Sequence, residues 1–297
     1  MWKCATASQS ASVATTALPA HNSPAPNANP QPRMSHLAIA HYELRITNKS
    51  FGNYALRITK MPEQLLGINP VNEALQAGRR IIHEIFVAQG TENNPRMRKL
   101  VSDAKYRHVK VTTISRADLG VRSGTRENQG VMAICEPFPY TPYAEILGAP
   151  RMVLLDNIED PHNIGAIMRT CEVLGWGNVL LPRRGAALVL PSVARSAAGA
   201  CEYLKIAVNC SSNQYVKIAQ EEGYQVVALD GAGKHTLEEV QAAHLAKLLL
   251  VVGGEDSGVG QFIKMNANYV CAIPQTGHVN SLNASVAAAL ALYALRY

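Results

Sequence analysis

Three segments in the second half of this 297-residue sequence combine polar side chains with glycines, and each follows an apolar run. The first contains Asn163 and, six residues later, Arg169. The second is the run Gly253-Gly254-Glu255, and the third brings Ser281 and Asn283 to the start of an alanine-rich helix. Amide, carboxylate and guanidinium groups can hold the polar groups of a ligand, and the glycines expose backbone N–H and C=O groups to its edge. The three segments are therefore the candidate site.

Each segment also has an interpretation that involves no ligand. Asn163 stands where a helix N-cap is expected, and Arg169 is equally compatible with a surface ion pair. Glu255 is equally compatible with a cap on the following helix. The third segment holds Ser281, Asn283 and Ser285 within five residues, which is more than a helix cap needs and favours a site.

The elements that position these segments alternate between strand and helix. Hydrophobic patterning predicts strands at 152–156, 178–181, 205–208, 225–229, 247–253 and 269–273, and helices at 164–174, 192–198, 212–222 and 282–295. Such alternation predicts an α/β domain over 150–297 with βαβ units around a largely parallel sheet. Ligands of these sheets bind beyond the carboxyl ends of the strands, where the three segments fall.

A second, smaller α/β domain is expected over 62–137, named here the front domain. Helices are predicted at 70–78 and 95–105, and strands at 81–87, 109–114 and 129–135. The stretch from Arg96 to Arg126 holds nine basic and two acidic residues, which suits a polyanionic partner such as RNA, although a solvated basic face would have the same composition. Residues 138–149 are predicted to be a linker. Residues 1–61 are predicted to be a poorly defined leader, disordered over the Ala-, Ser-, Asn- and Pro-rich stretch 1–33.

Several other classes of protein fit poorly. No stretch approaches 18 consecutive apolar residues, which argues against a transmembrane helix. The six cysteines form no C-x-x-C pair and the nine histidines no ligand cluster, so no metal is predicted and reduced cysteines in the cytoplasm are expected. A dehydrogenase is disfavoured because the glycine fingerprint of dinucleotide sites is missing.

In their order and spacing, 163–170, 253–258 and 281–285 resemble the three motifs of the TrmH/SpoU branch of the SPOUT RNA methyltransferases. Residues 67–75 and 128–131 resemble the opening and closing signatures of the ribosomal-protein-like substrate-binding domain of RlmB-type rRNA ribose methyltransferases. The resemblance implies S-adenosylmethionine-dependent methylation of a ribose 2′-hydroxyl in RNA, at a guanosine of large-subunit rRNA. It also implies a deep trefoil knot at the carboxyl end and a homodimer.

The resemblance assigns a role to each candidate residue. Gly253, Gly254, Ile273 and Leu282 would hold the cofactor. The ribose would be surrounded by Asn163, Arg169, Glu255, Ser281 and Asn283. For Arg169 two roles stay open: it loses a proton in an unusual site and acts as the base, or it stabilises the developing alkoxide beside a phosphate. Two alternatives remain open: a tRNA ribose methyltransferase, and a non-catalytic RNA-binding or ribosome-assembly factor that keeps the fold.

Overall fold

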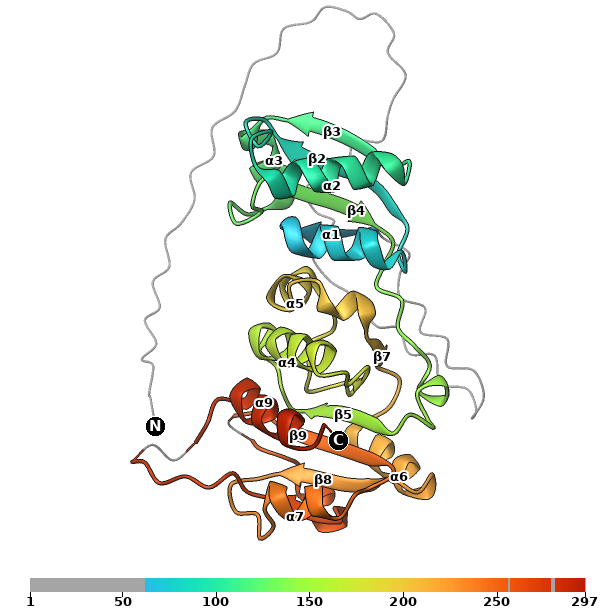
Figure 1. The fold of residues 1–297 in the computed structure, drawn as a ribbon, viewed down its shortest axis with the longest axis vertical. Helices are drawn as coiled ribbons and strands as arrows, with labels where there is room; N and C mark the ends of the chain where they lie inside the picture. Colours follow the sequence, from blue (N-terminus) through green and yellow to red (C-terminus); the bar gives the residue numbers. More distant parts are fainter. Residues whose placement is uncertain (1–61, 256, 279–280, 297) are drawn as a thin grey trace, which may run out of the picture. The chain divides into compact units, whose positions relative to one another are not determined.

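The computed structural model of the protein describes residues 62–255, 257–278 and 281–296 (Figure 1). Within them the chain forms two separate sheets, one before residue 136 and one after residue 150. The α/β class predicted from the sequence is confirmed, whereas the threading of the knot stays a prediction. The predicted leader, 1–61, lies outside the described residues. No helix within the described ranges has the length and apolar character needed to cross a bilayer.

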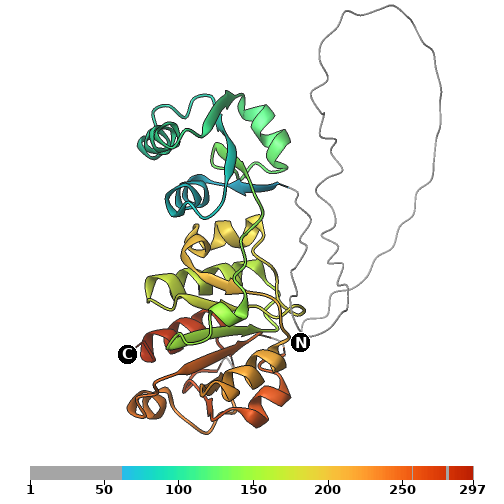
Figure 2. The same ribbon diagram turned by 90° about the vertical axis from the view of Figure 1, so that its right-hand side faces the viewer.

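The front domain contains a four-stranded mixed sheet in the order β1-β4-β2-β3. Its strands are β1 (Glu63–Leu66), β2 (Ile82–Ala88), β3 (Lys110–Ile114) and β4 (Val131–Cys135), and its helices are α1 (Ile68–Ala77), α2 (Pro95–Tyr106) and α3 (Arg116–Ser123). Buried residues of α1 and α2 pack on one face of the sheet, and Leu119 of α3 packs on the other, with Phe86 and Met132 (Figure 2). Strand β3 pairs only with β2 and forms an edge of this sheet.

The second sheet has six strands, all parallel, in the order β10-β8-β9-β5-β6-β7. The strands are β5 (Arg151–Asp156), β6 (Asn178–Leu180), β7 (Lys205–Ala207), β8 (Gln225–Leu229), β9 (Leu248–Gly253) and β10 (Tyr269–Cys271). The central strands β5 and β9 are buried along almost their whole length, as expected of a parallel sheet covered on both faces.

Five helices connect the described strands: α4 (Pro161–Val173), α5 (Pro191–Ser196), α6 (Ser212–Glu221), α7 (Leu237–Ala242) and α8 (Gln261–Asn266). A sixth helix, α9 (Ala284–Ala294), follows the last strand, β10. Apolar residues of α4, α5, α7 and α9 share a core with Val153 and Leu250 on one face of the sheet. Apolar residues of α6 and α8 share a core with Leu154 and Val251 on the opposite face. Consecutive residues of a strand thus belong to the cores on opposite faces of the sheet, because successive side chains of a strand point to opposite faces.

Strand order identifies where a ligand would bind. From β5 the chain moves outward through β6 and β7, and it then returns to build β8, β9 and β10 on the other side of β5. The order therefore reverses between β5 and β9, and the crevice beyond their carboxyl ends is the switch point at which open parallel sheets bind ligands. Residues after Asp156 and after Gly253 line that edge.

A buried ion cluster joins the two halves of the chain. The Arg80 guanidinium, whose side chain is 0% exposed, lies 2.7 Å from Oε1 of Glu202 and 2.9 Å from Oε2 of Glu63. Burial alone would lower the pKa of Arg80, but Glu202, the Cys135 thiol and Glu63 outweigh it and raise the pKa. Arg80 also lies over the ring of Phe138, 4.8 Å from its centroid. The predicted linker 138–149 thus begins with a buried aromatic ring, and it contains a 3₁₀ turn at Tyr143–Glu145.

Candidate active site

The three polar segments converge at the switch point. Asn163 lies in the first turn of α4, which follows β5. Glu255 lies two residues beyond the end of β9, and Asn283 is the N-cap of α9. Because β5 and β9 are paired neighbours, their carboxyl ends bring Asn163 and Glu255 together, although 92 residues separate them in the sequence.

Asn163, Glu255 and Asn283, named here the amide–carboxylate cluster, are joined by hydrogen bonds. Glu255 Oε1 accepts from Nδ2 of Asn163 at 2.9 Å and from Nδ2 of Asn283 at 2.5 Å. Asn283 Nδ2 also donates to Oδ1 of Asn163 at 3.0 Å. These bonds fix the orientation of both amides. Oε2 of Glu255 has no partner among the described residues, and it remains available to accept a hydrogen bond from a ligand.

Two residues of the cluster, Asn283 and Glu255, also cap α9. Asn283 Oδ1 accepts from the backbone N–H groups of Ser285 at 3.0 Å and Val286 at 3.3 Å, and from the Ser285 hydroxyl at 2.6 Å. Glu255 Oε1 accepts weakly from the N–H of Ala284 at 3.4 Å. The expectation that Glu255 caps the helix that follows it is wrong, because the helix end it reaches is that of α9. Asn283 and Glu255 therefore both cap α9 and determine the geometry of the site.

Asn163 is not the N-cap that the sequence suggested. Helix α4 begins at Pro161, and Asp160 is its N-cap, with its carboxylate accepting from the N–H of His162 at 2.9 Å. The cap falls three residues earlier because proline suits the first helical position and Asp160 precedes it. The Asn163 side chain is thereby released from capping and reaches Glu255.

Two glycines allow the close approaches on which this geometry depends. A Cβ on Gly254 would lie 2.0 Å from the carbonyl oxygen of Asn157, so the β9 loop packs directly on the backbone of the β5 loop. A Cβ on Gly165 would lie 2.5 Å from the Cβ of Ser196, because α4 packs closely on α5 at this residue. Neither position accommodates a side chain without movement of its neighbour.

Arg169 and Ser281 are not part of the amide–carboxylate cluster. Arg169 is exposed and forms no hydrogen bond or ion pair with any described residue, so the surface ion pair considered for it does not form within the described chain. Six residues of α-helix place it about 9 Å along α4 and about 120° around the axis from Asn163. Ser281 is exposed, two residues before the N-cap of α9.

The residues expected to hold the cofactor lie on the same edge of the sheet. Gly253 ends β9, Ile273 lies two residues beyond β10, and Leu282 immediately precedes Asn283. The backbone N–H and C=O groups of Ile273 and Leu282 have no hydrogen-bond partner among the described residues. Unpaired backbone groups on partly buried loops suit the polar edge of a nucleoside-containing cofactor, so the chain fits S-adenosylmethionine at this edge.

Asp156 is a structural residue of the site that the sequence reasoning missed. Its side chain is 4% exposed at the end of β5, and its Oδ2 accepts from the N–H of Gly260 at 2.8 Å. Its backbone oxygen accepts from the N–H of Gly254 at 3.0 Å. Asp156 thus holds both ends of the loop that carries Glu255. The signal for it was a carboxylate at the end of an otherwise apolar run.

Comparison with known families gives two matches along the chain. Residues 150–293 match the SpoU rRNA methylase family, and residues 64–141 match the family described as RNA 2′-O ribose methyltransferase substrate binding. A Mycobacterium avium protein named as an uncharacterized tRNA/rRNA methyltransferase is 35% identical over 240 residues, covering 79% of this chain and 77% of its own. A protein of the same name from Mycobacterium sp. strain KMS is 36% identical over 243 residues, covering 80% and 76%.

The chain belongs to the SpoU rRNA methylase family. It is therefore an RNA methyltransferase that uses S-adenosylmethionine, and the resemblance drawn from its three motifs is confirmed. The open alternative of a non-catalytic RNA-binding factor is set aside by the same result. No group of three histidine, cysteine, aspartate or glutamate residues that could hold a metal occurs within the described ranges.

Solved structures agree with this SpoU methylase in fold. The methyltransferase AviRb of Streptomyces viridochromogenes superposes with a TM-score of 0.66 at 22% identity, covering 79% of this chain and 88% of AviRb. The AdoMet-bound rRNA methyltransferase of Sinorhizobium meliloti superposes with a TM-score of 0.66 at 23% identity, covering 80% and 87%. At these identities the likeness concerns the fold, and it confirms the SPOUT architecture.

Proposed function

We propose that this SpoU methylase transfers a methyl group from S-adenosylmethionine to the 2′-hydroxyl of a guanosine ribose in large-subunit rRNA. The amide–carboxylate cluster carries this proposal, because it brings one residue from each of the three motifs to a single point at the switch of the sheet. The front domain supports an RNA substrate, since residues 64–141 match a family described as binding the substrate of RNA 2′-O ribose methyltransferases. The rRNA and guanosine assignments rest on the RlmB-type resemblance of that domain.

Each residue of the site has a chemical task in this proposal. S-adenosylmethionine supplies a methyl group that is already activated by a sulfonium, so the protein must orient the hydroxyl for in-line attack and remove its proton. Glu255 Oε2 accepts the hydrogen bond of the ribose hydroxyl and takes up its proton, while Asn163 and Asn283 hold the carboxylate in place. Ser281 contacts the ribose, and the backbones of Gly253, Gly254, Ile273 and Leu282 hold the cofactor.

Arg169 acts on the charge that develops during transfer. An arginine side chain keeps its proton in proteins, so we assign it to the developing alkoxide and the neighbouring phosphate rather than to proton removal. Its exposed guanidinium, with no partner among the described residues, is free to contact RNA.

The test is transfer of a labelled methyl group to unmodified rRNA and tRNA transcripts, followed by nucleoside digestion. Label in 2′-O-methylguanosine from large-subunit rRNA is the expected result. Label in a tRNA nucleoside would overturn the substrate and support the tRNA alternative, and label on a base would overturn the reaction. A cytoplasmic location is part of the proposal.

A homodimer through the SPOUT domain is part of the proposal, and α9 supports it. Val286, Leu290 and Tyr293 recur at helical spacing along α9 and are 48%, 47% and 59% exposed. Three large apolar side chains on one face of a helix form a stripe of the kind that subunit interfaces bury. Replacement Leu290→Glu should convert a dimer into a monomer in sedimentation equilibrium, with the control Val121→Glu still dimeric. A monomeric wild-type protein would exclude the dimer.

A further inference from the structure

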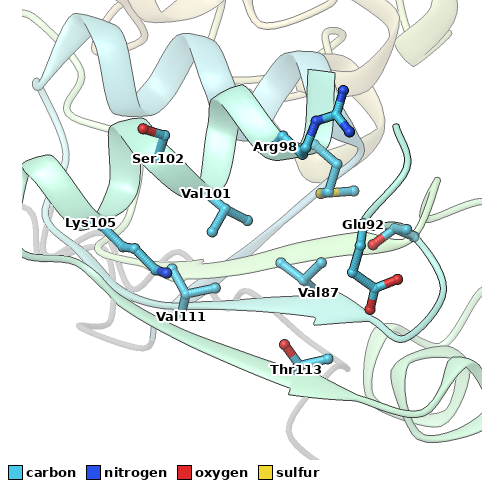
Figure 3. Close-up of a pocket in the computed structure, with 10 residues that line it drawn as sticks. Val87, Glu92, Arg98, Val101, Ser102, Lys105, Val111 and Thr113 are labelled. Carbon is cyan, nitrogen blue, oxygen red and sulfur yellow. The ribbon is translucent and has the colours of Figure 1, made fainter. Parts of the chain in front are cut away.

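A pocket of about 480 Å³ lies in the front domain, far in the sequence from the residues assigned to methyl transfer. Figure 3 shows it between α2 on one side and strands β2 and β3 on the other. Val101 projects into it from α2, Val87 from β2 and Val111 from β3. Its volume falls within the range of about 300–1,000 Å³ that is usual for sites of small ligands.

The apolar surface of the pocket is incompletely covered by protein. Val87 is buried, at 5% exposure, but Val101 and Val111 remain only partly buried on α2 and the edge strand β3. Aliphatic side chains on two facing elements present a slot with apolar walls. Apolar walls of this kind can pack against the face of a planar ring.

The rim of the pocket carries positive charge that no described carboxylate neutralises. Arg98 and Lys105 both line the pocket, and neither has a carboxylate partner among the described residues. Asp103, which lies between them on α2, instead pairs with Lys99 at 3.0 Å and accepts from Gln76 at 2.9 Å. Two unpaired cations about two helical turns apart are placed to contact an anionic backbone on either side of the slot.

One carboxylate faces the same pocket from the loop after β2. Glu92 Oε1 accepts from the N–H of Gly90 at 3.2 Å, and Oε2 has no partner among the described residues. A carboxylate would repel a phosphate, but it is the natural acceptor for the N–H groups on the Watson–Crick edge of a base. The pocket thus combines an apolar slot, one acceptor and flanking cations.

We propose that this pocket binds a single unstacked nucleobase of the RNA substrate, with Glu92 accepting from the base edge and with Arg98 and Lys105 on the flanking phosphates. RNA is recognised in sequence mainly through bases that are splayed out of loops and bulges and packed against side chains. The two cations favour an anionic occupant over a neutral peptide strand added to β3. The inference rests on the proposed function for the identity of the polymer, and it adds a second contact that selects which RNA is bound.

The first experiment uses the full-length wild-type protein. Unmodified large-subunit rRNA transcripts that carry 4-thiouridine or 6-thioguanosine are bound, irradiated and digested, and the linked peptides are identified by mass spectrometry. The expected result is a nucleotide linked to residues of α2 or β3 that line the pocket. Links confined to other parts of the protein would overturn the proposal.

The second experiment measures RNA binding by filter retention with matched variants. Val101→Glu should weaken binding about tenfold, whereas Val121→Glu, on α3 at the opposite face of the sheet and 64% exposed, should leave it unchanged. Arg98→Gln should reduce the slope of log Kd against log salt by about one, and the control Arg116→Gln on α3 should not. Wild-type affinity for Val101→Glu would overturn the proposal.

The two sets of results separate this inference from the proposed function. Crosslinking and binding do not require methyl transfer, so they test the pocket even if the transcripts receive no label. Methyl transfer without pocket crosslinks would leave the proposed function standing and remove the pocket. Pocket crosslinks without 2′-O-methylation would leave the pocket standing and remove the proposed function.

Discussion

Asn283 offers a way to separate the two tasks of the amide–carboxylate cluster. Its Oδ1 caps α9 through Ser285 and Val286, and its Nδ2 donates to Glu255 and Asn163. Replacement Asn283→Ser keeps an oxygen suited to the N-cap but removes the amide donor. Replacement Asn283→Ala removes both. The pair of variants therefore distinguishes helix stability from the positioning of Glu255.

The expected magnitudes follow from the bonds that each variant loses. Asparagine and serine are nearly equivalent as N-caps, so Asn283→Ser should change the free energy of unfolding by less than about 0.5 kcal/mol. Loss of a hydrogen bond to a charged carboxylate costs about 1.5–3 kcal/mol, and the exposure of the cluster places this site near the lower end. If that energy holds Glu255 in its productive position, the rate of methyl transfer falls about 10- to 100-fold. Asn283→Ala should show the same loss of rate and a further destabilisation of about 1 kcal/mol.

The assay is single-turnover methyl transfer at saturating RNA and S-adenosylmethionine, together with thermal unfolding of each variant. For a chain of this size, about 1 kcal/mol corresponds to a fall in Tm of about 2–4 °C for the alanine variant. Ser285→Ala is the control, because it loses the 2.6 Å bond to Asn283 Oδ1 but leaves the contacts with Glu255 and Asn163 intact. If the Asn283→Ser variant is as active as the wild type, the reasoning is refuted, since Asn283 would then act only as the N-cap of α9.

The remaining predictions concern three other sites. Arg169→Lys should reduce the rate of methyl transfer by about 100-fold or more, because lysine lacks the planar guanidinium that forms two parallel hydrogen bonds. Binding of S-adenosylmethionine, measured by calorimetry, should be unchanged. Turnover comparable to that of the wild type would rule out the assigned role. Arg80→Met should lower the free energy of unfolding, measured in urea, by about 3–5 kcal/mol. The reason is that it leaves the carboxylate of Glu202, which is 1% exposed, without its partner. A loss below about 1 kcal/mol would contradict the burial argument. Burial raises the pKa of Asp230, but the N–H of Ala232 and the Lys264 ammonium outweigh it and lower the pKa. The stabilisation is therefore complete above the unfolded pKa of about 3.9 and is lost as the pH falls through the lower folded value. Asp230→Asn should flatten the dependence of Tm on pH in this acid range, and parallel curves for the two proteins would show that the interaction is unimportant.

The fold could be predicted from the sequence wherever burial dominates. The run Gln225–Leu229 was predicted with its observed bounds, and the other strands of the large sheet within two residues at either end, because both faces of a parallel strand are apolar. Helices α3, α7 and α8 were missed, since each has only six to eight residues and is too short to show a helical period. Helix α3 is instead defined by its ends, with Ser115 as the N-cap and Gly124 in the left-handed conformation after it.

The candidate site could be predicted only as far as chain topology determines it. The carboxyl ends of parallel strands share one edge, so Asn163 and Glu255 had to lie near one another once their strands were known. The position around the helix axis decides which further residues belong to the cluster. Arg169 lies six residues along α4 and about 120° around the axis from Asn163, so it lies outside the cluster. The order of the motifs in the sequence does not reveal this. The catalytic roles of all three residues stay proposals.

The front-domain pocket, which we propose binds a base, illustrates why a site built from several helices and strands cannot be predicted from the sequence. The basic residues of α2 indicated a polyanionic partner from composition alone, because charge is visible without the fold. The slot beside them depends on the parallel pairing of β2 with β3, which sets Val87 beside Thr113 and brings Val111 to the edge under α2. Periodicity predicts that these valines are apolar positions of strands, but it does not predict which of them remain partly uncovered. Incomplete burial at an edge strand, next to cations without a carboxylate partner among the described residues, is therefore the observation on which the proposed contact with a base rests.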